Sequence, residues 1–278
     1  MTIYFAAGAV RFLLGAGPTR SDSKCNNPTC CAHIGMIVKA TRTGIPHEPG
    51  SNVLKPVDCV VMDIEGTTTA IEFVTQTLYP YARARMPDFI RRRRGEPEVA
   101  AIMDEVRQIA NVWNDEAVVT CLCAWMDADR KVTPLKTLQG LIWEEGYRRG
   151  DLVSHLYPDV LPALRAWHAR GVRLYIYSSG SVLAQRLIYG HTVDGDLGPL
   201  VSGYFDTRVG HKRDTASYRR IAEAIGTRPQ RILFLSDVRQ ELDAARDAGY
   251  QTVWLVRSGA PALAAAHRRA ARFDQIPL

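Results

Sequence analysis

The sequence predicts an α/β fold in which a doubly wound parallel sheet with Rossmann-like topology carries a helical cap inserted after its first strand. From residue 158 onward, short apolar runs rich in β-branched residues alternate with helical stretches, as in βα units with right-handed crossovers. One more apolar run, at 57–62, stands apart, and the stretch 73–152 that follows it contains no convincing strand. Together these observations predict one sheet interrupted by one helical insertion.

Apart from Asp58, the run at 57–62 is apolar without alternation, which is typical of a strand buried on both faces of a parallel sheet. It ends abruptly in Asp63 and Glu65, followed by Gly66 and two threonines. In open α/β sheets the ligand crevice lies beyond the carboxyl ends of the strands. A carboxylate there can bind a hard cation or attack phosphorus; the alternative is an acidic turn that only closes a strand.

Residues 73–152 are expected to form the cap, and residues 53–72 and 153–278 the α/β core. Acidic or proline-containing starts mark several helices in the cap. Its aromatic residues should fill the interior rather than contact a ligand, because a packed helix needs an apolar stripe. The expected cap helices span 97–110, 115–128 and 134–149, and the aromatic residues are Trp113, Trp125, Trp143 and Tyr147.

The core should contain strands and helices in alternation, with Gly171 and Gly249 ending two of the helices. A helical tail is expected after the last strand. The expected strands span 172–177, 203–207, 231–235 and 251–256, and the expected helices span 159–170, 182–189, 214–225 and 239–248.

Residues 1–52 show no sustained period and are rich in Gly, Pro, Ser and Thr, so we expect a poorly ordered N-terminal extension. The apolar stretch 3–14 makes a poor signal peptide, since Arg11 interrupts it and no positive segment precedes it. One hypothesis is that the extension is dispensable and that Met36 is an alternative start.

The composition, with 46% apolar and 23% charged residues, is ordinary for a soluble globular protein. The net charge of +6 suits an anionic substrate without demonstrating one. The arginine run 91–94 lies at an expected helix end, where cations are favoured, and no nucleic-acid motif accompanies it. No apolar stretch reaches membrane-spanning length. We therefore expect a cytoplasmic protein that binds neither nucleic acid nor membranes.

The six cysteines do not suggest a disulfide scaffold in a chain of this size, and Cys59 lies in a strand expected to be buried. Cys25, Cys30, Cys31 and His33 lie close together, but their spacing matches no ordinary zinc motif and no second cluster completes a site. A reduced protein without structural zinc is the expectation.

Three predicted strands end in polar groups that suit phosphoryl transfer. Asp63 and Glu65 follow the first strand, Ser178 and Ser179 another, and Asp237 a third, while Lys212 lies on the connection between the last two. Asp63 could act as nucleophile, and Asp63 with Asp237 could hold Mg²⁺ through oxygen. A serine at a helix N-terminus offers hydroxyl and amide groups to a phosphate. A lysine offsets the charge of the phosphoryl group.

Each of these residues also has a structural explanation. Ser179 or Ser181 could cap the helix that follows, Asp237 could cap the next one, and Lys212 could be an ordinary exposed lysine. Their order at successive strand ends is the observation that favours catalysis.

This order resembles the haloacid dehalogenase superfamily of phosphohydrolases, except that the second carboxylate is Glu65 instead of aspartate. Within that superfamily, the segments 63–68, 177–181, 210–212 and 235–237 are similar to the enolase-phosphatase family of methionine salvage. Gln139-Gly140-Leu141-Ile142-Trp143 and the glycines that follow resemble that family's cap. The resemblance covers about 57–278 and leaves the first residues unexplained.

The resemblance implies a bifunctional enzyme with one Mg²⁺ per chain. Such an enzyme enolises 2,3-diketo-5-methylthiopentyl-1-phosphate and then releases phosphate to leave the acireductone. Asp63 would be the nucleophile and a metal ligand, and Glu65 a general acid or base and a metal ligand through its side chain or its backbone carbonyl. Asp237 would complete the metal site. Ser178, Ser179 and Lys212 would contact the substrate phosphate, and Glu241 would orient water or Lys212. The family is largely monomeric, so we expect a monomer.

Three other functions stay open at this point. The first is a plain Mg²⁺-dependent phosphatase of the same superfamily, without enolisation. A dehalogenase is another, although it would leave Asp237 without a metal to bind. The third is a binding or regulatory protein on an inactive phosphatase scaffold, which retention of every chemical group argues against.

Deleting residues 1–52 tests the expectation that this segment is dispensable. The truncated chain should keep its activity and its melting temperature, because the expected core and cap begin after residue 52. Steady-state assays and thermal melts of both chains measure this, and a large loss of either quantity would contradict the expectation.

Overall fold

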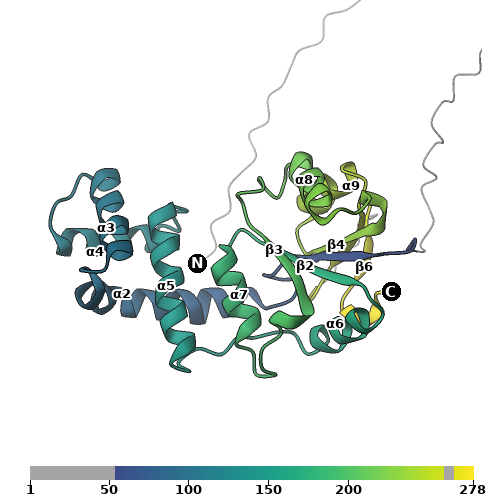
Figure 1. The fold of residues 1–278 in the computed structure, drawn as a ribbon, viewed down its shortest axis with the longest axis horizontal. Coiled ribbons are helices and arrows are strands. Elements are labelled where there is room, and N and C mark those ends of the chain that lie inside the picture. The colour runs from purple at the N-terminus through teal and green to yellow at the C-terminus, as the bar shows by residue number, and fades with distance from the viewer. Residues whose placement is uncertain (1–53, 260–265) are drawn as a thin grey trace, which may run out of the picture. The chain divides into compact units, whose positions relative to one another are not determined.

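A six-stranded parallel sheet forms the centre of the computed structural model, which describes residues 54–259 and 266–278 (Figure 1). Its strand order is β3-β2-β1-β4-β5-β6, so the chain runs outward from β1 in one direction and then in the other. This is the predicted doubly wound topology. The strands are β1 (Cys59–Met62), β2 (Arg173–Tyr177), β3 (Val201–Phe205), β4 (Ile232–Ser236), β5 (Gln251–Leu255) and β6 (Arg268–Ala270).

Successive residues of β1 contribute to two separate apolar cores, because side chains alternate across a strand. Val60 and Met62 belong to one core, and Cys59 and Val61 to the other, and all four are fully buried. Helices α6 and α7 pack on the first face of the sheet and α8 and α9 on the second (Figure 1). These helices are α6 (Val160–Ala169), α7 (Val182–Gly190), α8 (Thr215–Ile225) and α9 (Arg239–Asp247).

The chain between β1 and α6 is helical, and between residues 73 and 152, all of which are described, it contains no strand. Trp143 donates a hydrogen bond from its ring nitrogen to the carbonyl of Leu78 at 2.8 Å, which ties the last long helix to the first turns. The helices are α1 (Ile71–Phe73), a π-helical turn (Val74–Leu78), α2 (Tyr79–Arg93), α3 (Pro97–Ala110), α4 (Asp115–Asp127) and α5 (Thr133–Arg148). The cap boundaries at 73 and 152 stay a prediction.

Two expectations from the sequence are wrong. The helical tail is replaced by β6, which pairs with β5 from Arg268 onward, because pairing with a free sheet edge outweighs weak local preference. Residues 260–265 lie outside the described part. Trp113 is 76% exposed, since it follows Asn111, whose left-handed conformation ends α3 and takes the chain off the apolar stripe. Trp125, Trp143 and Tyr147 are buried as predicted.

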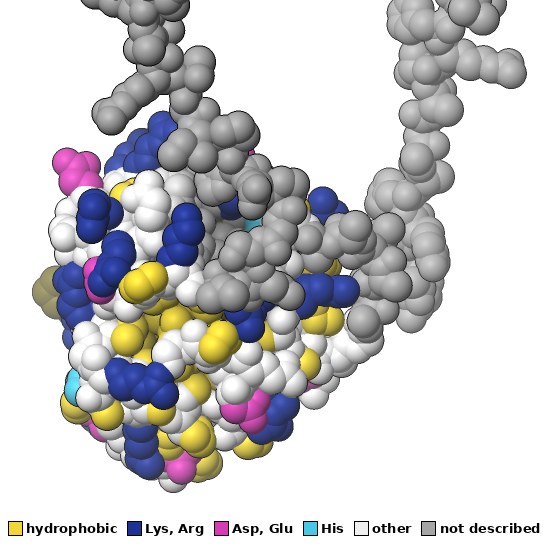
Figure 2. All heavy atoms as spheres, turned by 90° about the vertical axis from the view of Figure 1, so that its right-hand side faces the viewer, with side chains coloured by type: hydrophobic (Ala, Val, Ile, Leu, Met, Phe, Trp, Pro, Cys, Tyr) yellow, Lys and Arg dark blue, Asp and Glu magenta, His cyan; other side chains and the backbone are white. Residues whose placement is uncertain are grey.

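The arginine run at the end of α2 is compensated by carboxylates. Arg92 lies 2.8 Å from both Asp88 and Glu145, and Arg94 lies 2.7 Å from Asp115. Arg91 and Arg93 are also paired with acidic side chains. Elsewhere, on the face that Figure 2 shows, lysine and arginine side chains are interspersed with hydrophobic and acidic ones.

None of the helices in the described ranges is both long and apolar enough to cross a membrane. Residues 1–52, for which an extension is expected, and the cysteine group at 25–31 lie outside the described residues.

Candidate active site

The register of the sheet brings three of the predicted site segments to one edge. Met62 of β1 pairs with Ile176 of β2 and with Leu235 of β4, so the three strands end at the same level. The amide of Asp63 continues this pairing by donating to the carbonyl of Leu235 at 2.9 Å. The residues that follow these strands therefore surround one point, as the open-sheet rule predicts.

Lys212 reaches this point from the connection between β3 and α8. Its ammonium lies 2.5 Å from Asp63 Oδ1 and 2.7 Å from Glu241 Oε2, and only 7% of the residue is exposed. Tyr218 donates to the carbonyl of Lys212 at 2.7 Å, which orients this part of the connection. Lys212 is thus a buried cation held between two carboxylates and not an ordinary surface lysine.

Ser236 joins the two carboxylates from the other side. Its hydroxyl lies 3.2 Å from Asp63 Oδ2 and 3.1 Å from Glu241 Oε2, so it donates to one of them at a time. Asp63 also accepts the amide of Ile64 at 2.8 Å. These contacts hold the Asp63 carboxylate in one orientation beside the ammonium.

The electrostatics of the cluster reflect an excess of negative charge. Burial, together with the charge of Asp63, raises the pKa of Asp237 to about 6 and that of Glu241 to about 7. Burial alone would lower the pKa of Lys212, but Asp63 and Glu241 outweigh it and raise that pKa above its ordinary value. The single positive charge of Lys212 therefore faces several carboxylates that lie close together in a largely buried space.

Glu65 lies in the turn after β1, half-buried, with its backbone bridged to Thr69. Burial and the neighbouring charge of Asp63 raise the pKa of its carboxyl above the ordinary range. A carboxyl whose pKa is raised toward the working pH is suited to act as a general acid.

Gly66 allows Asp237 to approach this turn. With φ of +72°, Gly66 is in the left-handed region, and a Cβ there would lie 2.3 Å from Asp237 Oδ2. The amide of Asp237 donates to the hydroxyl of Thr67 at 3.0 Å. Yet Asp237 Oδ1 is buried without a hydrogen-bond partner, which is costly for a carboxylate. Asp237 does not cap α9 either, so the capping alternative is wrong.

The residues present suit Mg²⁺. The unpartnered oxygen of Asp237 and the surplus of carboxylates are what a divalent cation would compensate. Within the described ranges, no group of three or more His, Cys, Asp or Glu side chains is arranged to hold a metal. Asp63 and Asp237 with the backbone carbonyl of Glu65 would agree with both findings, because Mg²⁺ commonly uses one or two carboxylates and keeps several waters.

The two predicted serines lie on the turn between β2 and α7. Ser178 is buried and its hydroxyl accepts the amide of Gly180 at 3.1 Å, whereas Ser179 is exposed. The helix cap is provided by Ser181, which accepts the amide of Ala184. Among the hydrogen bonds of the described residues, none joins Ser178 or Ser179 to Asp63 or Lys212. Ser178 and Ser179 therefore follow β2 beside the candidate site without a direct bond to its charged groups.

Several residues near the site were not predicted from the sequence. Lys136 of α5 donates to the carbonyl of Ser179 at 2.9 Å and so links the helical insertion to the serine turn. Ser236 and Thr67 hold acidic groups in place. Thr67 and Ser236 lie within the motif segments 63–68 and 235–237, so their positions were marked by the sequence although their contacts were not. Lys136 carries no local pattern that distinguishes it from other helix lysines.

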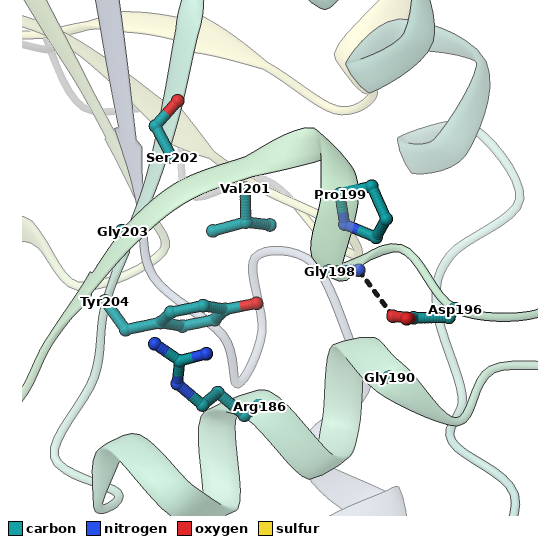
Figure 3. Close-up of a pocket in the computed structure, with 9 residues that line it drawn as sticks. All are labelled: Arg186, Gly190, Asp196, Gly198, Pro199, Val201, Ser202, Gly203 and Tyr204. Carbon is teal, nitrogen blue, oxygen red and sulfur yellow. Dashed lines mark hydrogen bonds between the residues drawn. The ribbon is translucent and has the colours of Figure 1, made fainter.

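A cavity of about 450 Å³ lies elsewhere, between α7 and the edge strand β3 (Figure 3). In it the Arg186 guanidinium stacks on the Tyr204 ring, 5.0 Å from the ring centre. None of the predicted site residues lines this cavity. The chemistry of the strand ends, and not the size of this hollow, locates the candidate active site.

Comparison with known proteins gives the site its context. Residues 57–249 match the family described as haloacid dehalogenase-like hydrolase. The chain is 52% identical over 222 residues to Enolase-phosphatase E1 of Methylococcus capsulatus, covering 79% of this chain and 97% of that protein. It is 55% identical over 205 residues to Enolase-phosphatase E1 of a Pseudomonas aeruginosa strain, covering 73% and 91%. The chain belongs to the enolase-phosphatases of the haloacid dehalogenase-like hydrolase family.

The fold agrees with this membership. The crystal structure of the UTR4 protein from Saccharomyces cerevisiae is similar, with a TM-score of 0.69 and 32% identity over 79% of this chain and all of that one. The resemblance drawn from the motifs is confirmed. This enolase-phosphatase family member is a hydrolase and not a binding protein on an inactive scaffold.

Replacing Lys212 tests the role of the central cation. Lys212→Ala should lower turnover roughly 10²–10³-fold, as removal of one charge-stabilising donor does in other enzymes. Lys212→Arg should not restore it fully, because a planar fork replaces a compact ammonium. Steady-state phosphate release measures both. Turnover of the alanine variant within a few-fold of the unmodified enzyme would contradict the assignment.

Proposed function

We propose that this chain converts 2,3-diketo-5-methylthiopentyl-1-phosphate to the acireductone 1,2-dihydroxy-3-keto-5-methylthiopentene and phosphate, as an enolase-phosphatase of methionine salvage. The observation that carries the proposal is the buried contact between Asp63 and Lys212. It lies where the carboxyl ends of β1, β2 and β4 come together. The similarity to proteins named Enolase-phosphatase E1 supports the two-step activity. We further propose a cytoplasmic monomer with one Mg²⁺ per chain.

For the phosphatase step, Asp63 would attack phosphorus and form an aspartyl-phosphate, while the bond from phosphorus to the substrate oxygen breaks. Glu65, whose raised pKa favours the protonated carboxyl, would give its proton to that departing oxygen. Water, deprotonated by Glu65 in turn, would then attack phosphorus, and the bond from phosphorus to Asp63 would break, which releases inorganic phosphate and restores the Asp63 carboxylate. Lys212 would offset negative charge on the phosphoryl oxygens throughout.

Phosphate binding would come from the serine turn. Ser178 and Ser179 follow β2 and precede α7, so their hydroxyls and the helix amides can face an anion. Binding of the phosphate there would also orient the carbon chain for enolisation before the phosphate is lost.

Mg²⁺ would be held by Asp63, by Asp237 and by Glu65 through its backbone carbonyl. Membership of the haloacid dehalogenase-like hydrolases is consistent with this ion. When bound, it supplies positive charge that stabilises developing negative charge on oxygen. The unpartnered Oδ1 of Asp237 supports this placement.

The helices of 73–152 would act as the cap that closes the substrate in. The bond from Lys136 to the serine turn supports this part of the proposal, because it joins α5 to a residue that would bind phosphate.

Asp63→Asn tests the nucleophile. The substitution keeps the side chain's shape but removes the attacking oxygen's charge, so phosphate release should fall by several orders of magnitude while the fold is retained. Phosphate assays together with circular dichroism measure the two quantities. Near-normal turnover of a folded variant would show that Asp63 is not the nucleophile.

The order of the two steps distinguishes the proposal from a plain phosphatase. Stopped-flow measurements with the diketone phosphate should show a transient ultraviolet absorbance from the enol phosphate before inorganic phosphate appears. EDTA should abolish both phases, since both develop charge on oxygen. Release of phosphate from this substrate with no preceding enol would favour the plain phosphatase.

A further inference from the structure

Arg257, just after β5, contacts the turn that carries the acidic residues. Its Nε and Nη2 atoms donate to the carbonyl of Thr67 at 3.1 and 2.6 Å. Thr67 is fully buried, so these two bonds satisfy a carbonyl that water cannot reach. The hydroxyl of the same threonine accepts the amide of Asp237. Thr67 therefore connects Arg257 to a residue of the proposed metal site.

Arg257 is itself held in one orientation. Its Nη1 lies 2.7 Å from Asp159 Oδ2, and its guanidinium lies over the rings of Tyr157 and Phe273 at 4.2 and 5.2 Å. Asp159 also accepts the amide of Phe273 at 2.7 Å. A planar guanidinium uses its donors and its faces at once, which an ammonium cannot do.

Strand β5, which directly precedes Arg257, also contacts Asp237. Trp254 of β5 donates from its ring nitrogen to the carbonyl of Asp237 at 2.9 Å. Trp254 and Arg257 thus reach the two segments whose carboxylates would meet at the metal, one through Asp237 and one through Thr67. The spacing of these segments is narrow, since even a Cβ on Gly66 would overlap the Asp237 carboxylate.

We propose that Arg257 is a positioning residue that sets the geometry of the Mg²⁺ site by holding the carbonyl of Thr67. It does not touch the reacting atoms. This inference rests on the proposed function, because it assigns a purpose to the contact only if Asp63 and Asp237 bind Mg²⁺. A buried ion pair by itself is weak evidence for stability, so the contact with Thr67 is the informative part.

The test compares Arg257→Met and Arg257→Lys with a control, Trp167→Leu. Trp167 is buried and stacks on Phe273, with 5.4 Å between ring centres, so its loss loosens the same C-terminal packing without removing a donor to Thr67. Isothermal titration calorimetry of the full chain with MgCl₂ alone gives Mg²⁺ affinity. Thermal melts give stability, and kinetics at saturating Mg²⁺ separate kcat from KM.

Both arginine variants should bind Mg²⁺ roughly 10–100-fold more weakly, as is found when groups that orient metal ligands are lost. The control should keep its Mg²⁺ affinity at a comparable loss of melting temperature. Arg257→Lys retains a cation next to Asp159 and gives a folded variant if Arg257→Met does not fold.

Three results would overturn the inference, two because Arg257 would be only structural and one because the metal site itself would fail. Mg²⁺ affinity of the folded arginine variants equal to that of the unmodified chain, or an equal loss in the control, would show that Arg257 only stabilises the fold. Absence of Mg²⁺ binding by the unmodified chain would overturn the proposed metal site and, with it, this inference.

Discussion

The structure of the site depends on one buried ammonium between two carboxylates. Lys212 lies between Asp63 and Glu241, and Ser236 contacts both acids from the other side. A buried carboxylate without a partner is strongly disfavoured. Removal of this lysine would leave two such carboxylates, with like charges facing each other. The lysine compensates only part of the negative charge of the site. The unpartnered oxygen of Asp237 belongs to the part that stays uncompensated.

This arrangement is possible because the parallel strands end at one level. The pairing of Met62 with both Ile176 and Leu235 sets the positions of Asp63, Ser178 and Asp237 through the backbone alone, independently of contacts between their side chains. Alternating side chains of β1 fill the cores on both faces, so a slip by one residue would move every side chain into the opposite core, which is packed for a different set of residues. The precision of the site is therefore a consequence of packing in the sheet.

Much of this was predictable from the sequence, and the failures have physical causes. The apolar run before Asp63 and the alternation after residue 158 predict a buried parallel sheet, since such patterns have few other solutions. β6 was missed because three residues at a sheet edge carry little local preference. Trp113 was misplaced because the turn at Asn111 depends on the backbone and not on hydrophobicity.

The candidate site was predictable for the residues to which we assign a direct chemical role. Asp63, Lys212 and Asp237 follow strands or lie between them at positions where chemistry explains their type. Ser178 and Ser179 were predicted because they precede a helix. Serines in that place can equally well cap the helix, and Ser181 is the residue that does so. Contacts such as Lys136 with Ser179 join segments 43 residues apart, and no local pattern indicates them.

Thr67 shows why the remaining groups escape sequence reasoning. Its hydroxyl accepts a hydrogen bond from the amide of Asp237. Its carbonyl accepts one from Arg257, which lies 190 residues further along the chain. Neither bond involves an ionised group of Thr67, so although this residue lies in the motif segment 63–68, its type does not reveal these two contacts. The threonine is nevertheless the place where the turn after β1, the segment after β4 and the segment after β5 meet. A substitution that kept every charged residue but displaced Thr67 would remove two bonds at once, one between its hydroxyl and the segment after β4 and one between its carbonyl and the segment after β5.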